Sequence, residues 1–235
     1  LVSGAVVFVG DGKGAEALEP FWKQLQRAQD TIEAVAMDMS PAYISAVLTH
    51  LPAAILVFDH FHIIKLFNEK LSDFRRDLYR EATEQLHKDV LKGTRWLLLK
   101  NPENLDPARQ ESRRLQEALM LNQPLATAYY MKEDLRRVWE QADKPAAQRF
   151  LDNWIYRAQS SGIRMLKKFA NTLATHRNQI LSFYDHRIST GPLEGTSTII
   201  RVLQRQAYGF PDAEFFKLKI YALHETRFEL IGGVS

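Results

Sequence analysis

Residues 32–59 read IEAVAMDMSPAYISAVLTHLPAAILVFD, and the elements that they predict decide the fold class. The apolar run Ile32–Met37 predicts a buried strand. Ser40 before Pro41 is typical of a helix N-cap followed by proline at the first helical position. The helix would cover 42–49, and a second apolar run, Ala53–Phe58, predicts the next strand. A strand, a helix and a strand in succession favour an α/β fold with at least partly parallel strands.

Both ends of the chain continue this pattern. The run Ala5–Val9 predicts a short strand that ends at a glycine-rich turn, and 15–28 has apolar residues at helical spacing. Near the other end, Gly191 and Pro192 open a helix that should run to about Tyr208, and a last amphipathic helix follows.

The middle of the chain, from about Ile63 to Tyr184, has helical periodicity throughout and few strand signals. One apolar stripe over 163–183 predicts a single long helix. The tryptophans of this region are expected in its core, and they are Trp96, Trp139 and Trp154. We therefore expect an all-helical insertion at 66–185 in an α/β domain made of 1–65 and 186–235.

Composition narrows the function only a little. The 235 residues are 46% hydrophobic and 25% charged, which is typical of an ordered globular protein. No cysteine is present, which excludes disulfides and cysteine-containing zinc sites. No apolar run approaches the roughly 20 residues of a membrane span, so no membrane partner is expected. A net charge of +3 favours a polyanionic partner weakly.

Three acidic residues are candidates for metal chemistry. Asp38 follows the strand Ile32–Met37, and ligand sites of open α/β sheets form beyond the carboxyl ends of strands. A loop aspartate that helps to cap the next helix is the alternative. Asp59 and His62 follow the second strand, where Asp59 could cap a helix or the pair could support a metal site.

The third candidate, Glu194, lies in the first turn of the helix opened by Pro192, where its charge suits the helix dipole. Arg201 follows two turns further along the same face, and Arg205 one turn beyond that. A carboxylate followed by two arginines on one stripe suits a metal site beside a phosphodiester backbone.

Taken together, these segments resemble the ISL-three family of bacterial insertion-sequence transposases, which cleave and join DNA with a DDE triad of acids. The resemblance implies an RNase H-like mixed sheet with flanking helices, interrupted by the helical insertion. The stretches that carry it are Val35–Tyr43, Pro52–Lys65, Leu91–Lys100 with Asn104 and Leu105, and Gly191–Gly195 through Arg205–Phe210.

The resemblance also implies residue roles. Asp38 would be the second acid and Glu194 the third, both binding Mg²⁺ or Mn²⁺, and Asp59 with His62 would be the family's Asp-x-x-His signature. A competing alignment makes Asp59 the second acid; we prefer Asp38 because it ends the strand after the first helix. The DNA-binding candidates are Arg201, Arg205 and Lys65.

Two departures from the family pattern qualify these roles. Thr190 and Ser197 stand where the family usually has asparagines. The family's first acid and its zinc-binding and helix-turn-helix segments would precede Leu1. We therefore expect this chain to be a C-terminal fragment that holds metal weakly or not at all and does not cleave DNA.

The expected partners are transposon-end and target DNA and, in the active complex, a second copy of the protein. The expected location is the bacterial cytoplasm, at the nucleoid. Two alternatives stay open: another RNase H-like nuclease, and a DNA-binding or dimerisation fragment without catalysis.

Overall fold

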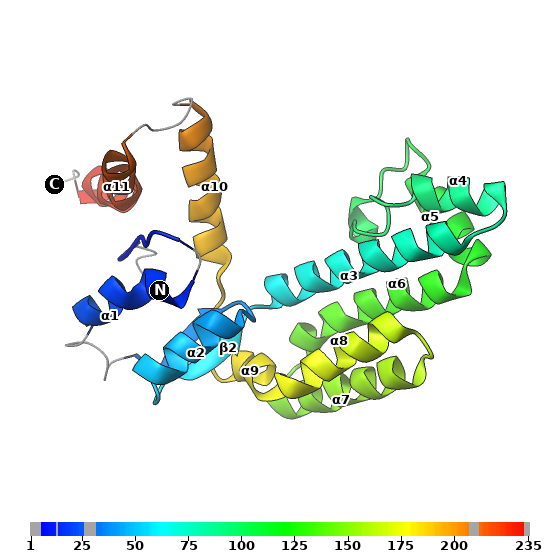
Figure 1. The fold of residues 1–235 in the computed structure, drawn as a ribbon, viewed down its shortest axis with the longest axis horizontal. Helices are drawn as coiled ribbons and strands as arrows, with labels where there is room; N and C mark the ends of the chain where they lie inside the picture. Colours follow the sequence, from blue (N-terminus) through cyan, green and yellow to red (C-terminus); the bar gives the residue numbers. More distant parts are fainter. Residues whose placement is uncertain (1–5, 13, 26–31, 207–211, 233–235) are drawn as a thin grey trace. The chain divides into compact units, whose positions relative to one another are not determined.

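The computed structural model describes residues 6–12, 14–25, 32–206 and 212–232. The chain divides into two compact units, Leu1–Asp59 with His186–Ser235, and His60–Asp185. We call the first the discontinuous unit and the second the helical unit (Figure 1). The division falls six residues before the predicted boundary at 65/66 and at the predicted boundary at 185/186. That the two units are a catalytic domain and its insertion stays a prediction.

The strand–helix–strand segment forms as the sequence predicts. Strands β1 (Ala34–Met37) and β2 (Ile55–Phe58) pair in parallel, with Ala34 opposite Ile55 and Met37 opposite Phe58. Helix α2 (Pro41–His50) connects them. Leu56, Val57 and Phe58 are almost fully buried, as expected for a continuous apolar strand.

The predicted RNase H-like mixed sheet is wrong. Within the described residues the sheet consists of β1 and β2 alone, in one parallel pair, and helices make up most of the fold. Of the predicted strand Ala5–Val9, residue 5 lies outside the described residues, and residues 6–9 are not a strand. The amide of Val9 donates to the Tyr221 hydroxyl (3.0 Å) rather than to a neighbouring strand.

The described residues of the discontinuous unit contain four further helices. Their bounds are η1 (Ala15–Leu18), α1 (Glu19–Leu25), α10 (Gly191–Gln206) and α11 (Ala213–Gly232). Trp22 of α1 is buried and stacks on His50 of α2, with ring centroids 4.7 Å apart. Lys217 of α11 pairs with Asp11 at 2.6 Å, which fastens α11 to the first described segment.

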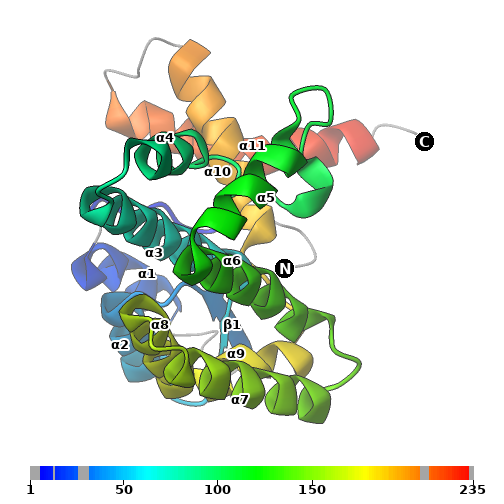
Figure 2. The same cartoon turned by 90° about the vertical axis from the view of Figure 1, so that its right-hand side faces the viewer.

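The helical unit is all α, as the periodicity predicts. Its long helices α3, α6, α7 and α8 lie side by side, and α4 and α5 lie at one end (Figures 1 and 2). The α-helices are α3 (His60–Glu81), α4 (Gln85–Gly93), α5 (Glu111–Leu121), α6 (Gln123–Arg136), α7 (Lys144–Ser160), α8 (Arg164–Thr175) and α9 (Arg177–Leu181). Short 3-10 turns are η3 (Pro102–Asn104), η4 (Arg137–Glu140) and η5 (Ser182–Tyr184).

An aromatic cluster forms the core of this unit. Trp154 is fully buried and packs edge-on against Phe67 and Phe169. The ring centroid of each phenylalanine lies 6.1 Å from the ring centroid of Trp154. Its indole N–H donates to the Met131 carbonyl (2.8 Å), so the ring is buried without an unmade hydrogen bond. The core prediction is confirmed for Trp154.

Two predictions for this region are wrong. Trp96 is 65% exposed, because it lies in a turn in which the next two residues, Leu97 and Leu98, take the buried positions. The stripe over 163–183 is not one helix, since His176 adopts φ −105° and ψ 19° and separates α8 from α9. No helix within the described residues is long and apolar enough to cross a bilayer.

Candidate functional site

The two aspartates that follow the strands lie at the same edge of the sheet. Met37 pairs with Phe58, and the amide of Asp59 donates to the Met37 carbonyl at 3.1 Å. Parallel pairing therefore brings Asp38 and Asp59 out side by side beyond the carboxyl ends of the strands, where ligands of such sheets bind.

Asp38 is half-exposed and organises the turn into α2. Its Oδ1 accepts a hydrogen bond from the amide of Ser40 at 3.0 Å, whereas the Ser40 side chain makes no capping bond. The aspartate, rather than the predicted serine, thus satisfies an amide at the helix start. This is the capping role that the sequence left open, and it occupies one carboxylate oxygen.

Asp59 is 2% exposed, and its contacts reach across the sequence to the start of α10. Its Oδ2 accepts from the amide of Thr190 at 3.1 Å and also from the Thr190 hydroxyl, and Thr190 is itself buried. A buried carboxylate needs such donors, because its desolvation is otherwise costly. Asp59 therefore fastens the end of β2 to the residue that precedes α10.

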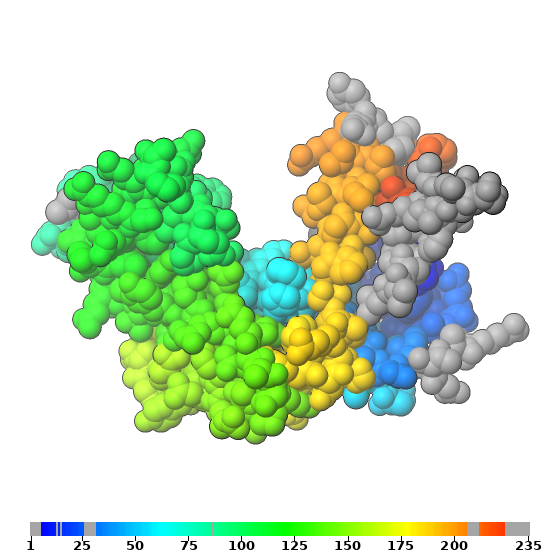
Figure 3. Space-filling view, turned by 180° about the vertical axis from the view of Figure 1, so that it is seen from behind, coloured from blue at the N-terminus to red at the C-terminus, as the bar shows by residue number. Residues whose placement is uncertain are grey.

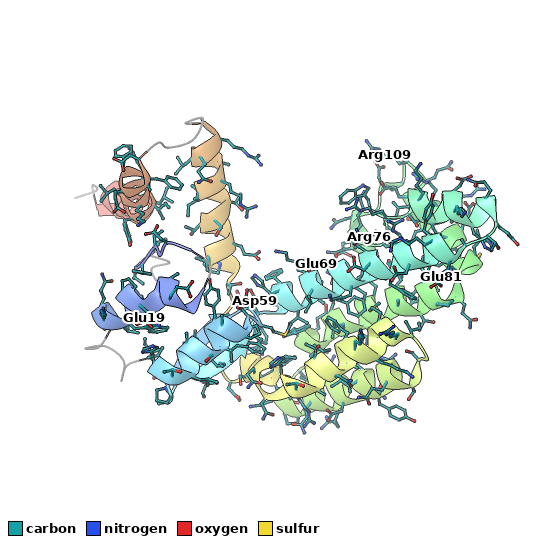
Figure 4. The ribbon with its side chains drawn as sticks, in the orientation of Figure 1. Glu19, Asp59, Glu69, Arg76, Glu81 and Arg109 are labelled. Carbon is teal, nitrogen blue, oxygen red and sulfur yellow. The ribbon has the colours of Figure 1, made fainter. Side chains whose placement is uncertain are left out.

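That contact positions Glu194. The amide of Glu194 donates to the Thr190 carbonyl at 2.9 Å, which makes Thr190 the N-cap of α10 and puts Glu194 in the first turn. Glu194 is exposed, and a side chain added at the neighbouring Gly195 would meet nothing within 4 Å. Figure 4 labels Asp59, which directly follows β2.

The predicted basic residues are exposed and divided between the units. Arg201 and Arg205 lie further along α10, and the Arg201 Nε–H donates to the Ser197 carbonyl of its own helix at 3.2 Å. Lys65 and His62 belong to α3, in the helical unit. Asp38, Asp59 and Glu194 all belong to the discontinuous unit.

The predicted metal ligands of this unit are carboxylates. Carboxylate oxygens such as those of Asp38 and Glu194 are the hard ligands that magnesium prefers. Yet the described part of the chain contains no group of three or more His, Cys, Asp or Glu side chains placed to hold a metal ion.

Comparison with known proteins decides the family. A family model for DDE transposases of the ISL3 type, described as "Transposase", matches residues 2–220. The chain belongs to the ISL3 transposase family. The resemblance found in the sequence motifs is thereby confirmed.

Curated relatives agree with this assignment. The transposase of insertion sequence element IS1001 from Bordetella parapertussis is 37% identical over 223 residues, covering 92% of this chain and 54% of the relative. The transposase of IS1557 from Mycobacterium tuberculosis is 30% identical over 232 residues, covering 88% and 51%. The chain thus spans about half the length of the relatives it matches. No solved structure matches it.

Sequence reasoning missed the partner of Asp59. The sequence does indicate that Thr190 needs a partner. Thr190-Gly-Pro opens a helix, and the backbone amide of the threonine at the N-cap needs a hydrogen-bond acceptor. Nothing local identifies an acceptor 131 residues away. The roles assigned to the acids and to the basic residues stay predictions.

Proposed function

We propose that this chain is the part of an insertion-sequence transposase that supplies Asp38 and Glu194 to metal-dependent cleavage and transfer of DNA strands at transposon ends. The observation that supports it is the buried Asp59–Thr190 contact. It fastens the helix whose first turn contains Glu194 to the sheet edge where Asp38 emerges. This supports a shared site for two acids that are 156 positions apart in the sequence.

The residue types suit the chemistry. Asp38 has its Oδ2 without a hydrogen bond in the described residues, and Glu194 is exposed, so both can offer hard oxygen ligands. Bound between such carboxylates, Mg²⁺ or Mn²⁺ would stabilise the entering and leaving oxygens of the phosphodiester. Asp59 would then act by positioning, because its Oδ2 accepts hydrogen bonds from both the amide and the hydroxyl of Thr190.

Arg201, Arg205 and Lys65 would bind DNA phosphates. All three are exposed, and the arginines follow Glu194 along α10. Phosphate contacts fix the register of a protein on DNA without reading its sequence. A bacterial protein that acts on transposon ends would work at the nucleoid, and joining two ends would require two copies.

The decisive experiment uses a longer protein that contains this chain and matches the length of the relatives. Glu194→Gln keeps the shape but removes the charge, so it should abolish cleavage of a transposon-end duplex and leave DNA binding nearly intact. The matched control is Glu69→Gln, an exposed glutamate on α3 outside the site (Figure 4). Full activity of the Glu194→Gln protein would overturn the proposal.

A second experiment uses residues 1–235 alone. Because the described residues contain no group of three or more side chains placed to hold a metal ion, we expect no detectable cleavage with magnesium or manganese. DNA binding should be weak and should fall steeply with salt, and Arg201→Ala should lower the log–log salt slope by about 0.9 on every sequence. If DNA binding proved insensitive to salt, the phosphate contacts would be refuted. Binding without cleavage by the longer protein would favour a non-catalytic DNA-binding module.

A further inference from the structure

Trp96 is a large aromatic side chain on the outside of the helical unit. It lies in the turn between α4 and η3 and is 65% exposed, whereas Trp154 of the same unit is fully buried. Exposing an indole forgoes the stabilisation that burial of so large a ring would give. The α4–α5 end of the unit forms part of the surface in Figure 3.

The turn that presents Trp96 is held from the inside. Leu97 and Leu98, next to it in the chain, are 3% and 1% exposed. Lys132 of α6 is also buried, and its ammonium donates to the carbonyls of Leu98 (2.8 Å) and Lys100 (3.3 Å). Burial lowers the pKa of Lys132, and the nearby Glu133 carboxylate (2.7 Å) opposes that shift. Trp96 is therefore displayed on an anchored turn.

Basic side chains lie at this turn. The Arg95 guanidinium lies over the Trp96 ring, 4.7 Å from its centroid, and no carboxylate pairs with Arg95 in the described residues. Arg114 of α5 donates to the Gly93 carbonyl at 3.3 Å and likewise has no acidic partner there. Residues 90–102 contain Lys92, Arg95 and Lys100 and no acidic residue, and of these Lys100 pairs with Glu111 of α5 at 2.5 Å.

The arginines are close enough to repel one another. Arg75 of α3 is 9% exposed, and its guanidinium donates to the Leu91 carbonyl at 2.8 Å. Its Nε has no hydrogen-bond partner among the described residues. Burial lowers the pKa of Arg75, and the charges of Arg95 and Arg76 lower it further. Figure 4 labels Arg76 on α3. An anion at this corner would relieve the repulsion.

We infer that the Arg95–Trp96 turn binds an unpaired nucleotide of a DNA end, with the base stacked on the Trp96 ring and its phosphate held by Arg95 and Arg114. Base stacking on an aromatic side chain tolerates any base, and arginine beside it adds a cation–π contribution. A turn anchored by Lys132 and two leucines can receive a base without reordering itself. This inference rests on the proposed function, because it names the DNA structure that the protein recognises.

The test compares two probes on the chain of 235 residues: a blunt DNA duplex and the same duplex with a short single-stranded overhang. The wild type should bind the overhang duplex more tightly. Trp96→Ala should remove that preference, weakening overhang binding about tenfold, which is within the range for loss of one stacked base. Trp96→Phe should restore most of it, and Arg95→Ala should weaken overhang binding more than blunt binding.

The matched control is Tyr156→Ala, since Tyr156 is an aromatic of similar exposure (69%) on α7 of the same unit. It should change neither affinity. Because Trp96 is exposed, thermal unfolding of Trp96→Ala should match the wild type, which separates lost binding from lost folding.

The possible failures are distinguishable. No binding of either probe by the wild type would refute DNA binding itself. Binding of both probes with no effect of Trp96→Ala would refute only the inference about this turn. A loss of self-association in Trp96→Ala, measured by sedimentation, with overhang binding unchanged would show a protein partner at Trp96 and overturn the nucleotide site.

Discussion

Helix α10 of the discontinuous unit differs from the long helices of the helical unit in the kind of interaction that holds it in place. In the helical unit, Trp154, Leu151, Leu166 and Leu173 are fully buried, and apolar packing joins α3, α6, α7 and α8. In α10 of the discontinuous unit, Thr196 is the only buried side chain among those described, and Leu193 is 60% exposed.

The difference shows where candidate functional residues can be placed. Apolar packing fixes many side chains at once but hides them. The helix with Glu194 and Arg201 keeps both exposed, and its start is positioned by a polar contact, Asp59 with Thr190. The side chains that stabilise the helical unit are thus buried, whereas the candidate functional side chains of α10 are exposed.

The largest effect should come from the helical core. Trp154→Ala removes a fully buried indole and its bond to the Met131 carbonyl, so the unit should lose about 3–5 kcal/mol of unfolding free energy. Urea unfolding followed by circular dichroism would measure the loss. Tyr156→Ala on the same helix should stay within about 0.5 kcal/mol. A loss from Trp154→Ala as small as that of this control would contradict the description of the core.

The second-largest effect should come from losing the contact between Asp59 and Thr190. Asp59→Ala leaves the amide and hydroxyl of buried Thr190 without their acceptor, at a cost of about 1–3 kcal/mol. Hydrogen exchange should accelerate in the first turn of α10 and stay unchanged in α7. Asp38→Asn is the control, because its amide oxygen can still accept from Ser40. Unchanged protection of α10 in Asp59→Ala would show that something else positions this helix.

Helix caps allow a smaller comparison of the two units. Asp143 caps α7 by accepting from the Ala146 amide at 2.7 Å, so Asp143→Ala should cost about 1 kcal/mol. Ser40→Ala should cost much less, because the Ser40 hydroxyl makes no capping bond to α2. Equal losses in thermal unfolding would contradict the assignment of the α2 cap to Asp38.

The smallest effect concerns pH. Burial lowers the pKa of His176 below its ordinary 6.5, so the unfolded chain binds more protons than the folded one just below that pH. Stability should be full above pH 6.5 and fall as the pH decreases toward the lowered pKa. Urea unfolding at pH 7.5 and 5.5 should show a smaller difference for His176→Gln. If the unfolding free energy of His176→Gln fell more between pH 7.5 and 5.5 than that of the wild type, the predicted direction of the pH dependence would be wrong.

Local patterns predicted the local elements. The continuous runs that became β1 and β2 and the proline that begins α2 are signals within a few residues. The mixed sheet failed because it was inferred from the family and not from strand signals, and the described residues supply one parallel pair.

The other errors have physical causes that periodicity does not contain. Trp96 lies in a turn, where the helical rule for buried positions does not apply. The predicted helix is interrupted between α8 and α9 by the backbone angles of a single residue, His176. Asp59 was found as a candidate, but its partner Thr190 is 131 residues away, and only the folded chain identifies it.

The closeness of the ends of the helical unit has a consequence for the order of folding. The rings of His60 and Phe183 lie 6.2 Å apart, so once this unit has folded, only the residues between Phe183 and Thr190 separate the two parts of the discontinuous unit. The entropic cost of closing a loop falls by roughly 0.6 kcal/mol each time the loop length is halved. The contact between Asp59 and Thr190 therefore costs about 2 kcal/mol less chain entropy when the helical unit has already folded than when it is unfolded. We therefore expect the helical unit to fold first and the contact that orders α10 to form afterwards.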